Sequence, residues 1–203
     1  MVEIMSHQVL EPTSRWSDDV VVEARSPIDE IATYLERTLG ELTSLTHVFS
    51  DGIDSVTLRE RLDEHLPVGP NQRDRTMLID DIIRLAMQFQ SRTISPRLTL
   101  KLEVIRTDAC RLFHADYYRQ RLLCTYLGPG TEWLEDSNVD RNGLGKGDNN
   151  NIVRNHDDIN HANTFDVLLL KGMKYGGGEL AVIHRSPPIL CRGGTRVLLK
   201  IDE

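Results

Sequence analysis

The chain has 203 residues, of which 27% are charged and 39% hydrophobic, and its 24 basic and 31 acidic residues give a net charge of −7. This acidic balance argues against binding to nucleic acid or to an anionic membrane surface, because both need positive protein surface. The apolar stretches are too short to cross a membrane and the first residues lack the form of a secretory signal, so we expect a cytoplasmic protein forming one compact domain.

The first half of the chain predicts three helices, at about 27–43, 55–66 and 74–90. Ser26 can cap the first of them, and Pro27 suits its first position. Apolar residues then recur at intervals of three and four, as on the buried face of an amphipathic helix. Residues 1–96 are therefore expected to form a helical extension.

The period changes from helical to alternating after Ser95-Pro96. Apolar and polar residues alternate over 98–104, which is typical of a half-buried strand. Further strand-like runs lie at 110–114, 121–127, 166–170, 179–184 and 196–201. Helices followed by many short strands predict an α+β fold, with a jelly-roll or cupin-like double-stranded β-helix over 97–203 and the N-terminal helices as its buttress. The polar region 136–164 has no sustained period, and we expect it to be a long loop, or a loop containing short elements, and a candidate lid.

His114, Asp116, His184 and Arg196 are the strongest candidates for a functional site. His114 and Asp116 are two residues apart and can face the same side of an extended segment. His184 follows an apolar run, and Arg196 opens the last one. Two histidines and one carboxylate can occupy one face of a metal ion and leave other positions open, which suits non-haem Fe(II). A hydrogen-bonded structural pair is the simpler interpretation of His114 and Asp116 taken alone.

The order of these residues resembles that of the Fe(II)/2-oxoglutarate dioxygenase superfamily, in its prolyl-hydroxylase branch. The similarity runs from about Leu98 to Asp202 and includes a strand with Arg, Thr and Tyr at 121–127, His184 followed by Pro187, and Gly-Thr-Arg at 194–196. It implies that His114, Asp116 and His184 bind Fe(II) and that Arg196 binds the distal carboxylate of 2-oxoglutarate. It implies Thr125 and Tyr126 as further co-substrate contacts, and Arg192 is an alternative anchor. The substrate would be a small molecule or a protein side chain.

The segments FHADYYRQRLLCTYLGPGTEW and HRSPP more narrowly resemble the bacterial domain-of-unknown-function family 1826. Genes of zinc homeostasis often lie beside members of that family. The resemblance therefore leaves open a second hypothesis, a non-catalytic protein that holds zinc through the same three ligands. A zinc-dependent hydrolase or lyase is a third, with Glu132 or Glu179 as its general base.

Other polar and sulfur-containing residues have simpler interpretations. Cys110, Cys124 and Cys191 are widely spaced and odd in number, which argues against a disulfide framework, and no Cys-x-x-Cys pair suggests a zinc knuckle. Arg119 and Arg121 either balance nearby carboxylates or line a substrate cavity.

Overall fold

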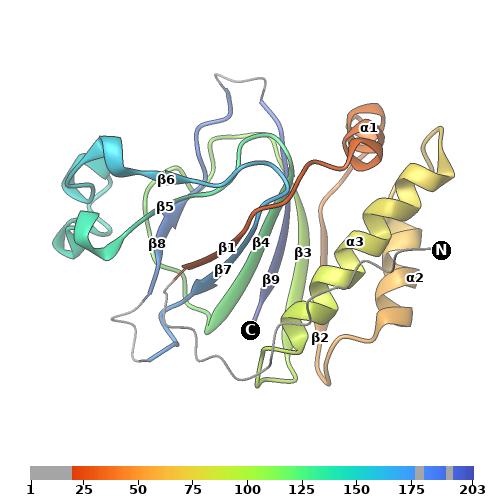
Figure 1. The fold of residues 1–203 in the computed structure, drawn as a ribbon, viewed down its shortest axis with the longest axis horizontal. Coiled ribbons are helices and arrows are strands. Elements are labelled where there is room, and N and C mark those ends of the chain that lie inside the picture. The colour runs from red at the N-terminus through yellow and green to blue at the C-terminus, as the bar shows by residue number, and fades with distance from the viewer. Residues whose placement is uncertain (1–19, 177–180, 191–193) are drawn as a thin grey trace, which may run out of the picture.

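The computed structural model describes residues 20–176, 181–190 and 194–203, and an antiparallel six-stranded sheet runs through its centre (Figure 1). The spatial order is β1-β7-β4-β9-β3-β2. Its strands are β1 (Val20–Glu23), β2 (Leu45–Phe49), β3 (Leu98–Ile105), β4 (Gln120–Leu127), β7 (Val167–Lys171) and β9 (Arg196–Asp202). The two edge strands, β1 and β2, come from the first 96 residues, so this sheet crosses the expected border between a helical extension and a core.

A smaller sheet lies on one face of the large one, in the order β6-β5-β8 (Figure 1). Its strands are β5 (Glu132–Leu134), β6 (Asn160–His161) and β8 (Ile183–Arg185). Leu123, Leu168 and Leu198 of the large sheet pack with Trp133 and Val182 in one buried cluster. This cluster joins the two sheets.

Three helices cover the opposite face of the large sheet (Figure 1). They are α1 (Asp29–Thr38), α2 (Ser55–His65) and α3 (Gln72–Gln90). The mixed helix-and-sheet class and the positions of the helices are confirmed, but α1 ends at Thr38 and has no side-chain cap. None of the helices in the described part of the chain is long and apolar enough to cross a membrane.

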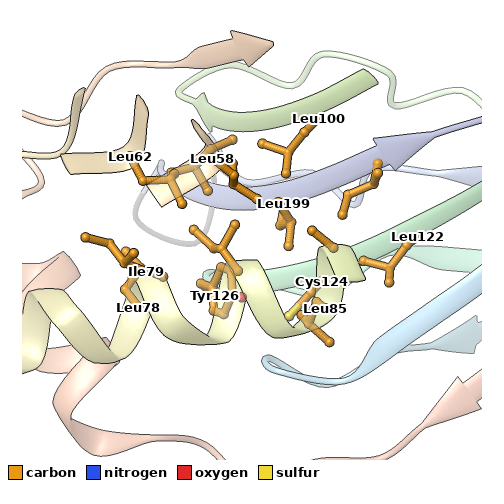
Figure 2. Packing of buried hydrophobic residues seen from close by; sticks show 14 of the residues in the cluster. Leu58, Leu62, Leu78, Ile79, Leu85, Leu100, Leu122, Cys124, Tyr126 and Leu199 are labelled. Atoms are coloured by element: carbon orange, nitrogen blue, oxygen red, sulfur yellow. The ribbon is translucent and has the colours of Figure 1, made fainter. Parts of the chain in front are cut away.

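Alternation along the strands decides which side chains reach which face of the large sheet. In β9, Val197, Leu199 and Ile201 pack in the cluster under the helices, whereas Leu198 packs with the small sheet. Figure 2 shows Leu199 on the side of α3, near Leu85. Because side chains alternate with a period of two, Arg196 and Lys200 share the face of Leu198.

Two expectations about the strands need correction, whereas region 136–164 is a loop with short elements, as the sequence allowed. Residues 110–114 do not form a strand, because Cys110 has φ 55° and only His114 makes an isolated bridge, to His184. The run 179–184 contributes only from Ile183 onward to β8, and residues 179 and 180 lie outside the described residues. Region 136–164 contains four short 3-10 helices, η1 (Asp136–Asn138), η2 (Arg141–Gly143), η3 (Asn149–Asn151) and η4 (His156–Asp158), as well as β6.

Candidate metal centre

Three side chains from two distant segments converge beside the small sheet. The backbones of His114 and His184 exchange two hydrogen bonds, each with an N–O distance of 3.0 Å. This bridge brings His114, in the segment between β3 and β4, against β8, and Asp116 follows two residues later. The potential ligand atoms of His114, Asp116 and His184 all lie within 4.8 Å of one another. Among the described residues, this is the one such group of His, Cys, Asp or Glu side chains that could share a metal ion.

Each imidazole ring is oriented by its own backbone. The Nδ1 atom of His114 lies 2.8 Å from the carbonyl oxygen of Leu112, and that of His184 lies 3.1 Å from the carbonyl oxygen of Val182. A carbonyl only accepts hydrogen bonds, so each Nδ1–H donates and each Nε2 faces the site. The Nε2 atoms lie 3.6 Å and 3.3 Å from the two carboxylate oxygens of Asp116. Two imidazole nitrogens and a carboxylate with ordered rings fit a divalent transition metal.

The protonation of the three residues follows from their surroundings. Burial alone would raise the pKa of Asp116, but its contacts with His114 and His184 and the charge of Arg121 hold it well below its usual range. The hydrogen bond with Asp116 raises the pKa of His114. Burial lowers the pKa of His184. The carboxylate is thus ionised and His184 is neutral near pH 7, whereas a metal ion must compete with the proton of His114.

Arg121 of β4 holds the carboxylate from the other side. Its guanidinium bonds to Asp116 and, through two nitrogens, to Asp202, with a distance of 2.9 Å from Nη2 to Oδ2. It also lies 4.0 Å over the ring of Tyr118. The sequence left two roles open for Arg121, pairing with nearby carboxylates or lining a cavity. In the structure its side chain does both. The other arginine considered with it, Arg119, lies near the C-terminus, where its Nε atom is 3.7 Å from a carboxylate oxygen of Glu203.

Arg196 is fully buried, and among the described residues it has no carboxylate partner. Nη1 donates to the hydroxyl of Ser186 at 2.8 Å, and Nη2 donates to those of Thr125 at 2.9 Å and Thr131 at 2.7 Å. Nε has no partner in the described structure. Burial lowers the pKa of Arg196 to about 10. A buried cation that bonds only to neutral hydroxyls is costly, and its charge is available to an anionic ligand.

One cavity of about 640 Å³ joins these groups. The metal-ligating candidates, Arg121 and Arg196 all line it. Its walls come from both sheets: Arg196 belongs to β9 of the large sheet, and His184 belongs to β8 of the small one. The four strongest candidates from the sequence, His114, Asp116, His184 and Arg196, thus line one cavity together with Arg121.

Tyr126 does not face this space. It lies next to Thr125 in β4, and adjacent residues of a strand point to opposite faces. Its hydroxyl donates to Asp81 of α3 at 2.7 Å, and Arg25 pairs with the same carboxylate at 2.8 Å (Figure 2 shows Tyr126 among the residues under α3). The expectation that Tyr126 contacts a co-substrate is therefore not supported by its position, whereas Thr125 reaches Arg196.

The loop 136–164 lies behind the site instead of over it. No residue of this segment is among the described residues that line the cavity. Val139, Ile152 and Val153 are buried against Phe113 and Ile183, and the side chain of Asn149 accepts from the backbone of Phe113 at 2.8 Å. This position does not fit the lid that was expected of the loop. The loop instead packs behind the residues next to His114 and His184 and supports them.

The remaining residues singled out from the sequence are paired elsewhere, are not placed by the structure, or are cysteines. Glu132 is buried in ion pairs with Arg185 and His161, so it is not poised as a general base. Glu179, Cys191 and Arg192 lie outside the described residues. Cys110 is exposed and lines the cavity, and Cys124 is buried under α3 with a pKa raised by burial to about 12.

A family model described as Protein of unknown function (DUF1826) matches residues 5–202. No curated protein matches the chain.

Among solved structures, the chain is similar to a Pseudomonas putida prolyl-4-hydroxylase, with 92% of each chain covered, 11% identity and a TM-score of 0.42. It is also similar to the Fe(II)/α-ketoglutarate-dependent dioxygenase TqaL, with 16% identity, 87% of this chain and 75% of that one covered, and a TM-score of 0.44. A third is the dioxygenase for auxin oxidation 1 from Arabidopsis thaliana in its 2-oxoglutarate complex, with 12% identity, 94% and 69% covered, and a TM-score of 0.44.

Proposed function

The chain belongs to the family Protein of unknown function (DUF1826), and we propose that it is an Fe(II)- and 2-oxoglutarate-dependent oxygenase that hydroxylates a small molecule or a protein side chain. One observation carries the proposal. A fully buried arginine, Arg196, shares a cavity with the His114, Asp116 and His184 group, and its described partners are hydroxyls only. A carboxylate-bearing co-substrate that also binds a metal would satisfy both features at once.

The proposed architecture is a double-stranded β-helix, or jelly roll. Two antiparallel sheets pack face to face around the cavity, with the helices outside the larger one, and this arrangement supports the proposal. In such a frame the residues of the site are held by strands, which fix the positions of side chains more closely than mobile loops do.

His114, Asp116 and His184 would hold the iron. When bound, Fe(II) and 2-oxoglutarate supply the oxidising power to insert one atom of dioxygen into a C–H bond of the substrate, with succinate and carbon dioxide as co-products. Arg121 would keep the Asp116 carboxylate ionised and directed into the site, because it binds that carboxylate while Asp202 fixes its own guanidinium. The carbonyls of Leu112 and Val182 would keep both Nε2 atoms directed at the metal.

Arg196 would bind the distal carboxylate of 2-oxoglutarate. The hydroxyls of Ser186, Thr125 and Thr131 hold its guanidinium plane in one orientation, so little freedom is lost when a ligand binds. A carboxylate would neutralise the buried charge with charge-assisted hydrogen bonds. A zinc-binding protein on the same three ligands would give Arg196 no task, and this favours the oxygenase over that alternative.

The test is a titration of 2-oxoglutarate into the anaerobic Fe(II) protein, followed by the metal-to-ligand charge-transfer absorbance. We expect a saturable band. Glutarate is the matched control: it has the carboxylate that Arg196 would bind but lacks the 2-oxo acid, so it should compete without producing the band. Absence of any band at millimolar 2-oxoglutarate would refute the proposal.

A further inference from the structure

The cavity extends sideways across the large sheet, away from the metal candidates. Leu123 of β4 is in register with Lys200 of β9, Lys200 with Lys101 of β3, and Lys101 with Thr46 of β2. All four residues line the cavity. Strands lie about 4.8 Å apart, so this row spans about 14 Å from β4 to the edge strand. The row forms an arm of the cavity that neither the metal ligands nor Arg196 occupies.

Two lysines face each other in the middle of this arm. Lys101 and Lys200 are direct partners on neighbouring antiparallel strands, and like charges in this position destabilise a sheet. The ammonium of Lys200 is paired with Glu103 at 2.9 Å. No carboxylate of the described residues pairs with Lys101. The fold thus keeps an uncompensated positive charge in a half-buried position, although the whole chain contains only five lysines.

The charges around the cavity are positive in an acidic protein. Six lysine and arginine side chains line it against two carboxylates, while the net charge of the chain is −7. The six are Lys101, Arg106, Arg121, Arg185, Arg196 and Lys200. Ion pairs with carboxylates engage Arg121, Arg185 and Lys200, and the guanidinium of Arg106 donates to the backbone carbonyls of Leu39 and Leu42, which follow α1. Within the described structure, Arg106, Arg196 and Lys101 have no carboxylate partner, and because backbone carbonyls hold Arg106, Arg196 and Lys101 are the two cations left open to an anion.

The backbone positions of these two cations lie in well-separated rows of the sheet. Arg196 is in register with Ile105, and Lys101 lies four residues earlier in the same strand, so the two rows are separated by about 13 Å. Hydroxyls fix the guanidinium of Arg196 in its own row. The cavity therefore has two positions for anions, of which 2-oxoglutarate would fill one.

We propose that Lys101 binds an anionic group, a carboxylate or a phosphate, of the substrate that this oxygenase hydroxylates. The assignment to a substrate rests on the proposed function, because the metal candidates line the same cavity. A bound anion would relieve the repulsion between Lys101 and Lys200. A positive cavity on a negative protein would also concentrate anionic substrates at its mouth.

Pyridoxal 5′-phosphate tests the anion position directly, because its aldehyde condenses with a lysine amine and its phosphate selects amines in anion sites. After borohydride reduction, peptide mapping should show Lys101 modified about tenfold or more faster than the exposed Lys146. Uncharged pyridoxal, the matched reagent, should show no such preference. Sulfate should protect Lys101, both alone and with saturating 2-oxoglutarate and Mn(II).

Two variants complete the test. Sulfate should raise the melting temperature of the wild type and of Lys146→Met but not of Lys101→Met. Without ligand, Lys101→Met should melt about 1–3 °C higher than the wild type, because the repulsion with Lys200 is removed. This rise in melting temperature would show that Lys101→Met is properly folded, so that its missing response to sulfate does not reflect a damaged fold.

Two outcomes would overturn the anion site: equal labelling of Lys101 and Lys146, or full protection of Lys101 by 2-oxoglutarate with no further effect of sulfate. Failure of the oxygenase is measured separately, by the charge-transfer titration. A wild type that shows selective labelling but no charge-transfer band would overturn the assignment of the anion to an oxygenase substrate.

Discussion

Replacing Arg196 by methionine separates a ligand-binding arginine from a structural one. Methionine keeps much of the side-chain bulk but removes the charge and the fork of donors. Arg196 donates only to the hydroxyls of Ser186, Thr125 and Thr131 and to none of the three metal-ligating candidates. We therefore expect Arg196→Met to retain Fe(II) and to lose affinity for 2-oxoglutarate.

The size of the loss can be estimated from the burial of the guanidinium. The lowering of the pKa of Arg196 from 12.5 to about 10 corresponds to about 3 kcal/mol against the charged form. A bound carboxylate that recovers this energy contributes on the order of a hundredfold in affinity. The value lies within the range of about 2–5 kcal/mol that is lost when one partner of a buried charge pair is removed.

Ligand-dependent melting measures this loss on the loaded protein. At 2-oxoglutarate concentrations about 100 times the dissociation constant, the wild type gains about 2.7 kcal/mol, which is roughly 5–10 °C for a chain of this size. For a variant that binds a hundredfold more weakly, the same concentration gives about 0.4 kcal/mol, or about 1 °C. Arg106→Met is the control, since Arg106 lines the same cavity but its guanidinium donates to backbone carbonyls. An equal shift in the wild type and Arg196→Met would refute Arg196 as the anchor.

Three further predictions follow from the contacts around the site. Asp116→Ala should abolish stable Fe(II) binding, because two imidazoles alone are a weak divalent site; unchanged iron content on metal analysis would contradict this. Fe(II) affinity should rise as the pH increases from below about 6.5 through the raised pKa of His114, because the metal must displace the proton of His114. His184 is already neutral in this range and adds no such dependence. Anaerobic Fe(II) titrations at several pH values check the direction. Tyr126→Phe should lower stability by about 1–3 kcal/mol in urea unfolding, because Asp81 loses a buried donor, and should leave 2-oxoglutarate affinity unchanged.

The sequence could predict the elements whose pattern is local and long. The helices near 55–66 and 74–90 and the alternation of β9 were predictable, because a repeated apolar period reports burial on one face. That alternation also indicated that Arg196 and Lys200 share a face. The edge strands β1 and β2 were not predicted: each has at most five residues, and each is fixed by a partner far along the chain, as in the pairing of Val20 with Leu170.

The residues of the candidate site could be predicted from the sequence, but the contacts that hold them in place could not. The spacing of His114, Asp116 and His184 indicated a shared centre, but the bridge that joins them is a long-range contact without a local signal. Tyr126 was expected to contact a co-substrate, but the alternation along a strand defines two faces without saying which one lines the cavity. A signal for its true position was present: Asp81 lies among the apolar residues of α3, and a buried carboxylate in such a place requires polar partners.

The partners of Arg25, Arg121 and Arg196 distinguish the tasks of these three arginines. Arg25 pairs with Asp81 and ties the helices to the sheet, and Arg121 pairs with Asp116 and Asp202. Because Arg121 keeps Asp202 when Asp116 is removed, Asp116→Ala does not leave a bare buried charge, and a loss of iron in that variant reports on the ligand and not on unfolding. Arg196 alone of the three meets only hydroxyls in the described structure. We propose that its carboxylate comes from a ligand, and this is why the charge-transfer titration and Arg196→Met together test whether this cavity belongs to an oxygenase.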